Sequence, residues 1–155
     1  MEVALQSLRV ALTMVLVLLA GAMAVASAGA ATTPAQRAMV DQVNAVRTAH
    51  GLRPFRAHPM LHRTARRYAR WMLRHDYFGH QQRIRAGSRF SLVGENLAWH
   101  SGWRPRVTGT VRAWLGSPGH RALLLDPRFR WLGAGMARGN LSGMAATTWV
   151  LHFGG

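Results

Sequence analysis

The sequence contains no cysteine and no lysine among its 155 residues, and only five of its residues are acidic. Without cysteine the chain has no disulfide bond, no thiol nucleophile and no thiolate metal ligand, so its stability depends on packing, helped at most by a metal held by other side chains. Nothing after residue 30 is apolar for long enough to span a membrane. These absences leave an arginine-rich chain with a formal net charge of +15.

Arginine supplies all twenty basic residues. Such an excess of positive charge favours attraction to anionic partners such as nucleic acid, phospholipid or cell-wall polymer. The preference for arginine over lysine also has a simpler explanation, because a GC-rich genome replaces lysine codons with arginine codons. Whatever its origin, the net positive charge attracts anionic molecules around the protein.

The first thirty residues have the pattern of a secretory signal peptide. Arg9 precedes an apolar run through Val10 to Val25, and small residues with two A-x-A sites follow. We therefore expect residues 1–30 to be a signal peptide, residues 31–155 to form one domain, and the protein to be secreted or extracytoplasmic. If the segment is not cleaved, it would anchor the protein in a membrane.

Helical patterns come first in the domain and strand patterns come later. Thr33 before Pro34 marks a helix start, and Gly51 marks its end. Near the end of the chain, two strand-like segments are bridged by "GNLSG", a loop of glycine, asparagine and serine that suits a hairpin. This order predicts an α+β layer fold. The expected elements are helices at about 34–50, 59–75 and 105–115, a short helical turn to residue 124, and strands at 130–138 and 144–153.

The second expected helix carries arginines along one side at helical spacing. This side could bind phosphate groups of nucleic acid or of an anionic lipid or envelope surface, or it could be an ordinary solvated face. The residues of the possible binding face are Arg63, Arg67, Arg70 and Arg74.

Because acids are scarce, an acid among apolar residues is informative. Glu95 lies in "LVGENLAW" and needs a partner, which could be a histidine, an arginine, a metal ion or backbone amides. His120 follows Ser117, Pro118 and Gly119 at the start of a short helix, where the positive helix end disfavours an imidazolium. The remaining histidines have weaker claims, apart from His80 considered below: His50, His58, His62, His75, His100 and His152.

Five segments in order resemble the CAP superfamily, also called SCP/TAPS, which comprises cysteine-rich secretory, antigen 5 and pathogenesis-related-1 proteins. The segments are "VDQVNAVRTAHGLRPF", "LHRTARRYARWMLRHDYFGH", "GENLAW", "VRAWLGSPGHRALLLDPRFRWLGAGMA" and "WVLHFGG". The resemblance is nearest to the short bacterial members. It implies a three-layer α-β-α sandwich with a central cavity.

The resemblance also implies which residues line that cavity. The two family histidines fall on His80 and His120 and the first family acid on Glu95, whereas the second acid position holds Ser117. Family members bind divalent metal, often zinc, through the two histidines, so His80 and His120 are the expected metal ligands. The full expected cavity set is His80, Glu95, Asn96, Trp114, Ser117 and His120.

Two classes of function fit this site. The first is a secreted binding module that holds a divalent metal or a small polar ligand. The second is a metal-assisted hydrolase of peptide, ester or nucleic acid, since two imidazoles and a carboxylate could hold zinc with one position open to water. Ser117 and His120 are three residues apart, so a serine–histidine nucleophile pair is conceivable but is the weaker hypothesis. The sequence leaves open whether the protein is an enzyme.

Overall fold

The computed structural model describes residues 32–85 and 89–155. The predicted signal peptide, residues 1–30, lies outside the described residues. Residues Thr32–Gly155 form one compact unit. Its elements are α2 (Pro34–Ala49), β1 (Arg56–Ala57), α3 (Pro59–Arg74), β2 (Val93–Ser101), α4 (Val107–Leu115), α5 (Pro118–Leu125), β3 (Trp131–Leu141) and β4 (Met144–Gly154).

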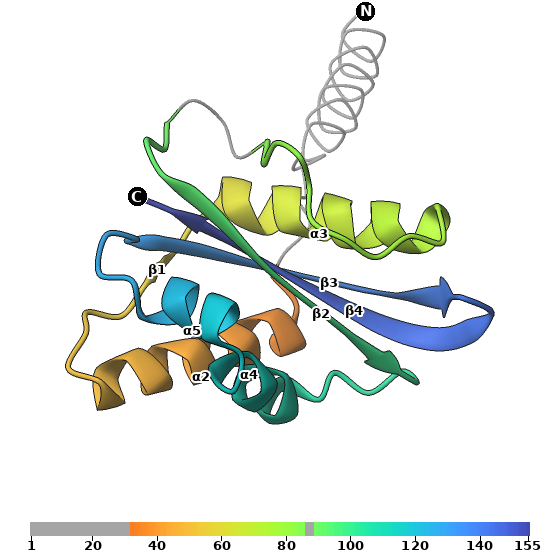
Figure 1. The fold of residues 1–155 in the computed structure, drawn as a ribbon, viewed down its shortest axis with the longest axis horizontal. Coiled ribbons are helices and arrows are strands. Elements are labelled where there is room, and N and C mark those ends of the chain that lie inside the picture. Colours follow the sequence, from red (N-terminus) through yellow and green to blue (C-terminus); the bar gives the residue numbers. More distant parts are fainter. Residues whose placement is uncertain (1–31, 86–88) are drawn as a thin grey trace, which may run out of the picture. The chain divides into compact units, whose positions relative to one another are not determined.

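The domain is a three-layer α-β-α sandwich, as expected (Figure 1). The sheet has the strand order β1-β3-β4-β2, with β1 parallel to β3 and the other pairs antiparallel. The helix α3 covers one face of the sheet, and α2, α4 and α5 cover the other (Figure 1). The centre of the sheet is therefore buried on both faces. No helix within the two described stretches has the length and apolar character needed to cross a membrane.

Local sequence explains most element boundaries. The Thr33 hydroxyl accepts a hydrogen bond from the backbone amide of Gln36 at 3.3 Å, and the Gln36 side-chain oxygen accepts one from the backbone amide of Thr33 at 2.9 Å. Pro34 occupies the first turn, so α2 begins where predicted. The second helix also matches its predicted range. The hairpin turn is shorter than the predicted five-residue bridge, because only Ser142 and Gly143 separate β3 from β4. Both have positive φ, as a tight two-residue hairpin turn requires.

Neither β1 nor β2 was assigned as a strand from the sequence. The segment "VGENLAWHS" forms β2, which pairs with β4 along its whole length and leaves its other edge unpaired within the sheet. Both faces of β2 are covered near Glu95 and Asn96, so apolar and polar residues do not alternate along the strand. The polar residue within this apolar run further conceals the strand pattern.

The helix α3 lies unusually close to β3. A Cβ atom added to Gly133 would lie 2.1 Å from the backbone carbon of Leu61, and one added to Gly135 would lie 2.2 Å from that of Ala65. Because the glycines of the "LGAG" segment have no side chain on this face, the backbone of α3 packs directly against the backbone of β3. This contact fixes the depth at which the turn from Leu61 to Arg66 lies on the sheet.

Side chains complete the edge of β3 beyond the short strand β1. The side-chain amide of Gln36 donates to the Ala134 carbonyl at 2.9 Å, and the backbone amide of Ala134 donates to Nδ1 of His62 at 3.0 Å. Both side chains are buried. They satisfy backbone groups that would otherwise be buried without partners. His62 thus has a structural role.

Candidate functional site

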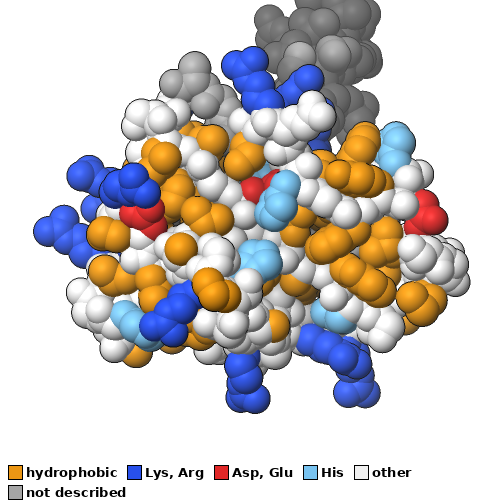
Figure 2. All heavy atoms as spheres, in the orientation of Figure 1, with side chains coloured by type: hydrophobic (Ala, Val, Ile, Leu, Met, Phe, Trp, Pro, Cys, Tyr) orange, Lys and Arg blue, Asp and Glu red, His pale blue; other side chains and the backbone are white. Residues whose placement is uncertain are grey.

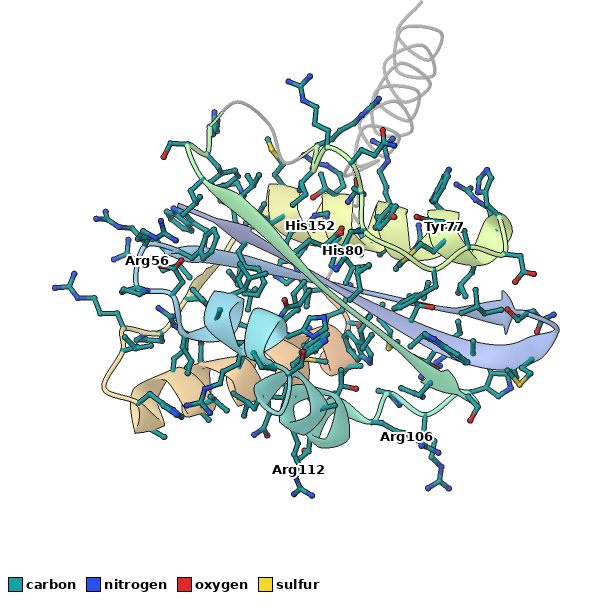
Figure 3. The ribbon with its side chains drawn as sticks, viewed as in Figure 1. Arg56, Tyr77, His80, Arg106, Arg112 and His152 are labelled. Carbon is teal, nitrogen blue, oxygen red and sulfur yellow. The ribbon has the colours of Figure 1, made fainter. Side chains whose placement is uncertain are left out.

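Glu95 is the third residue of β2, opposite His152 on β4. Only 5% of Glu95 is exposed, and His152 is fully buried. Directly opposed residues of an antiparallel pair point to the same face of the sheet, and His152 lies beside α3, near His80 (Figure 3). The carboxylate and the imidazole therefore meet on the face that α3 covers. The acid singled out by its scarcity is therefore a buried, partnered acid.

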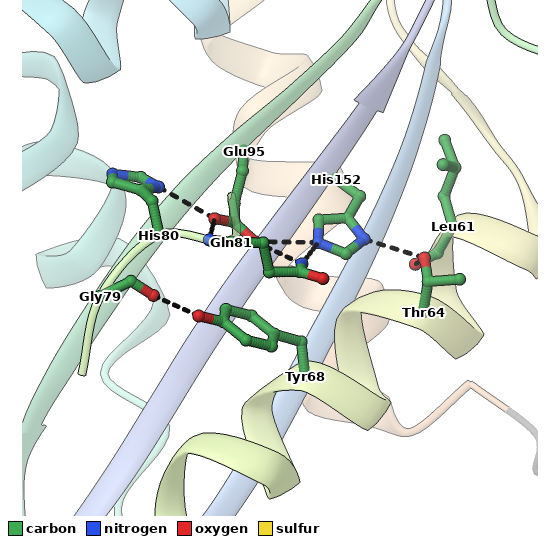
Figure 4. Close-up of polar contacts among 8 residues, drawn as sticks. All are labelled: Leu61, Thr64, Tyr68, Gly79, His80, Gln81, Glu95 and His152. Carbon is green, nitrogen blue, oxygen red and sulfur yellow. Dashed lines mark hydrogen bonds and ion pairs between the residues drawn. The ribbon is translucent and has the colours of Figure 1, made fainter. Parts of the chain in front are cut away.

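The Glu95 carboxylate accepts hydrogen bonds on both oxygens (Figure 4). Oε1 lies 2.9 Å from Nδ1 of His80 and 3.1 Å from the backbone nitrogen of Gln81. Oε2 lies 2.8 Å from Nε2 of Gln81 and 3.1 Å from Nε2 of His152. Burial by itself would raise the pKa of Glu95, but the hydrogen bonds from His152, Gln81 and His80 outweigh it and lower that pKa. Glu95 is thus an ionised acid in the interior.

His80 reaches Glu95 from the loop after α3. The Tyr68 hydroxyl of α3 donates to the Gly79 carbonyl and fixes this loop next to the helix (Figure 4). Burial, followed by the negative charge of Glu95, raises the pKa of Tyr68 to about 12, so the hydroxyl keeps its proton. The side chain of His80 is 59% exposed. Its Nδ1 faces Glu95, and Nε2 is the ring atom left for a ligand.

His120 is held in a matching way from the other side of β2. Its Nδ1 lies 2.9 Å from Oγ of Ser117, the residue that precedes α5. Burial, and then the nearby charge of His80, lower the pKa of His120. This lowering has the direction expected from the sequence, with burial as its main cause. As in His80, Nε2 is the ring nitrogen left for a ligand. Figure 2 shows histidine side chains gathered at the centre of one face beside an acidic side chain.

Asn96 and Trp114 lie on the other side of β2 from Glu95. The Asn96 amide donates to the His120 carbonyl at 3.1 Å, and its Oδ1 is buried without a partner. Trp114 is buried in the core formed with α2 and α4, and its indole donates to the Leu97 carbonyl at 2.8 Å. Asn96 therefore touches the backbone of an expected ligand residue, whereas the contacts of Trp114 are those of a core residue that anchors α4.

The sequence did not indicate the buried partners of Glu95. His152 was placed among the histidines with weaker claims, and Thr64 and Gln81 were not considered. The Thr64 hydroxyl lies 2.8 Å from Nδ1 of His152, on the side of the ring away from Glu95. A usable signal was the position of His152 inside the apolar strand "TWVLHFGG", where a polar residue needs a partner just as Glu95 does.

The expected three-ligand set of two histidines and Glu95 is not formed. Within residues 32–85 and 89–155, no group of three or more His, Asp or Glu side chains is placed to hold one metal ion. Both Glu95 oxygens already accept hydrogen bonds from protein groups, so Glu95 contacts the Nδ1 side of the His80 ring and does not lie beside it as a third ligand. Any metal at this site would therefore be held by imidazole nitrogens, with water completing its coordination, as transition metals such as zinc allow.

A serine nucleophile finds little support in the geometry. Ser117 contacts Nδ1 of His120, but in the described part of the chain no carboxylate hydrogen-bonds to that imidazole. The third member that orients the base in serine hydrolases is therefore missing.

A family model and two curated relatives match most of this chain. The family model of the cysteine-rich secretory protein family (CAP) matches residues 40–153. YkwD of Bacillus subtilis (strain 168) is 31% identical over 119 residues, which cover 70% of this chain and 45% of YkwD. The chain thus spans less than half of this curated relative, and 32% of a second one from the same organism.

Two solved structures show the same fold. An outer surface protein from Borrelia burgdorferi superposes with a TM-score of 0.65 at 22% identity, covering 80% of this chain and 94% of that one. NaASP2, whose structure was solved with Zn²⁺, superposes with a TM-score of 0.61 at 14% identity, covering 79% of this chain and 80% of that one.

Proposed function

We propose that this chain, which belongs to the cysteine-rich secretory protein (CAP) family, is an extracytoplasmic protein that binds a divalent metal ion through His80 and His120. One observation carries the proposal: Nδ1 of each ring is held by a neighbouring side chain, which leaves Nε2 of each ring as the ligand atom. The signal-like segment at residues 1–30 supports the location.

Glu95 and Ser117 contact the Nδ1 atoms of the two rings and would hold a metal-binding pair of histidines in place. A carboxylate bonded to the far nitrogen of a ligating histidine fixes the ring and raises its basicity, as Glu95 would for His80. Ser117 would orient His120 in the same way. A bound metal would supply a Lewis acid for polarising a ligand or water. The solved structure of NaASP2 with Zn²⁺ is in keeping with metal binding on this fold.

Titration of tag-free protein with Zn²⁺ in a calorimeter tests the proposal. We expect one site per chain, and a loss of affinity of at least about tenfold in His80→Ala and in His120→Ala. His50→Ala is the matched control, because His50 is an exposed histidine whose Nδ1 contacts its own helix. Absence of binding in the wild type, or equal affinity in all four proteins, would refute the proposal.

A second candidate function is attachment to an anionic lipid surface through the arginine face of α3, defined as Arg63, Arg67, Arg70 and Arg74. All four side chains are exposed. In the described stretches the ion pairs involve His80, His152 and Arg128, and none involves these four residues. Burial and the charges of Arg70 and Arg63 lower the pKa of Arg66, which reports the crowding of positive charge on this helix.

Vesicle binding tests the arginine face. Near an anionic surface each arginine contributes about 1 kcal/mol, so replacing all four with glutamine should weaken binding to vesicles containing phosphatidylglycerol by more than about a hundredfold at low salt. The matched control replaces four exposed arginines elsewhere, namely Arg53, Arg104, Arg112 and Arg121. Equal weakening in both variants, or binding that is insensitive to salt, would refute a role for this face.

A further inference from the structure

His152 occupies a place in the site that the proposed metal ligation does not use. It is fully buried on β4, with Glu95 on one side of its ring and Thr64 of α3 on the other (Figure 4). Nε2 lies 3.1 Å from Oε2 of Glu95, and Nδ1 lies 2.8 Å from the Thr64 hydroxyl. The ring thus connects the acid on the edge strand to the helix that covers the sheet.

Counting donors and acceptors assigns the proton positions in this chain of contacts. An ionised carboxylate only accepts hydrogen bonds, so Nε2 of His152 must carry a hydrogen to bond to Glu95. In the neutral ring Nδ1 is then an acceptor, so the Thr64 hydroxyl donates to it at 2.8 Å in place of the Leu61 carbonyl, which lies 3.2 Å away. The amide nitrogen of Gln81 lies 3.0 Å from Nε2 of His152, but two donors cannot bond to each other, so this amide donates to Glu95.

The same accounting applies to His80. Its Nδ1 faces Oε1 of Glu95 at 2.9 Å, so it carries the hydrogen, and Nε2 of the neutral ring keeps its lone pair. That tautomer depends on Glu95 being held in place. Without the donor from His152, Oε2 would keep only the Gln81 amide, and the carboxylate would be free to rotate away from His80. A rotated Glu95 no longer requires a hydrogen on Nδ1 of His80.

We propose that His152, itself oriented by Thr64, is a positioning residue that holds Glu95 in place and thereby sets the tautomer of His80, so that Nε2 of His80 is the ligand atom. Its importance for metal binding rests on the proposed function. The tautomer itself is measurable without metal, so the two proposals can fail separately.

Imidazole ¹⁵N NMR of metal-free protein at about pH 8.5, above the ordinary histidine pKa of about 6.5, reads the tautomers directly. We expect His80 in the wild type to carry its hydrogen on Nδ1. In His152→Leu that form should lose its dominance, and His152→Gln should restore it, because the glutamine amide can again donate to Glu95. In the same variants Zn²⁺ affinity should fall about tenfold and then recover.

Two further variants keep the test decisive. Thr64→Val removes only the hydroxyl and should shift the tautomers of both His152 and His80, even if His152→Leu does not fold. His62→Gln is the matched control, because His62 is a buried histidine that bonds to Ala134 and not to Glu95; it should leave His80 unchanged. A wild-type His80 with its hydrogen on Nε2, or an unchanged His80 in folded His152→Leu or Thr64→Val, would overturn the proposal. A tautomer shift without any Zn²⁺ binding would refute the metal site alone.

Discussion

Gly135→Ala tests the close contact between α3 and β3. The new methyl carbon would lie 2.2 Å from the backbone carbon of Ala65 and 2.3 Å from the backbone nitrogen of Arg66. Carbon atoms in van der Waals contact are about 3.5 Å apart, so the helix or the strand must move by roughly 1.3 Å. Backbone atoms of a packed helix cannot rotate out of the way as a side chain can.

The expected cost follows from this shortfall. Overpacking a core usually destabilises a protein by about 1–3 kcal/mol, and a clash with backbone lies at the upper end of that range. For a domain of this size, about 3 kcal/mol corresponds to a fall in Tm of roughly 12 °C. The turn of α3 that must move also carries Thr64, so the bond from Thr64 to His152 should be lost as well.

Thermal and urea unfolding of two alanine variants measures the effect. Gly109→Ala is the matched control, because Gly109 lies in α4 with nothing within 4 Å of its added Cβ. Alanine there should stabilise the protein by about 0.5–1 kcal/mol, since glycine in a helix is unfavourable. If Gly135→Ala is as stable as Gly109→Ala, the close approach of helix and strand described above is incorrect.

Three further predictions concern charge and metal. Because the pKa of Glu95 is lowered in the folded state, its ionised form stabilises the fold above the unfolded carboxyl pKa of about 4.3. This contribution is lost as the pH falls through the folded pKa. Urea unfolding from pH 7 to pH 3 should show this loss in the wild type and a flatter profile in Glu95→Gln. Arg47→Met should destabilise by about 2–4 kcal/mol in urea unfolding, because the buried guanidinium donates to three backbone carbonyls, at 2.7, 2.9 and 3.2 Å; no change would contradict its role in joining α2 to α5. Ser117→Ala should weaken Zn²⁺ binding about tenfold in calorimetry without altering the fold, because His120 loses the group that orients its ring; unchanged affinity would contradict this.

Much of the fold follows from patterns that the sequence carries locally. The start of α2 is set by Thr33, Pro34 and Gln36 within four residues, and α3 shows its buried side at helical spacing. Glu95 also stood out locally, as one of few acids and the only one within an apolar run. Features of this kind can be predicted because the interactions that produce them join residues close in the chain.

The rest of the site depends on contacts between distant residues. His152 meets Glu95 only because of the register between β2 and β4, which joins residues 57 positions apart. Thr64 reaches His152 only because glycines on β3 let α3 lie so close to the sheet. Neither fact can be read from hydrophobic periodicity. The positions of His80 and His120 came from the family resemblance, which does not supply the groups behind each ring.

The position of β4 in the sheet has a consequence for how this protein is made. β4 follows every other strand in chain order, yet it lies between β3 and β2 and contributes His152 to the site. Until residues 144–154 have been synthesised, β2 has no neighbour to pair with and Glu95 stays in water. A chain threaded across a membrane from its amino end while it is still being synthesised would therefore keep its sheet open until nearly all of this domain had been made.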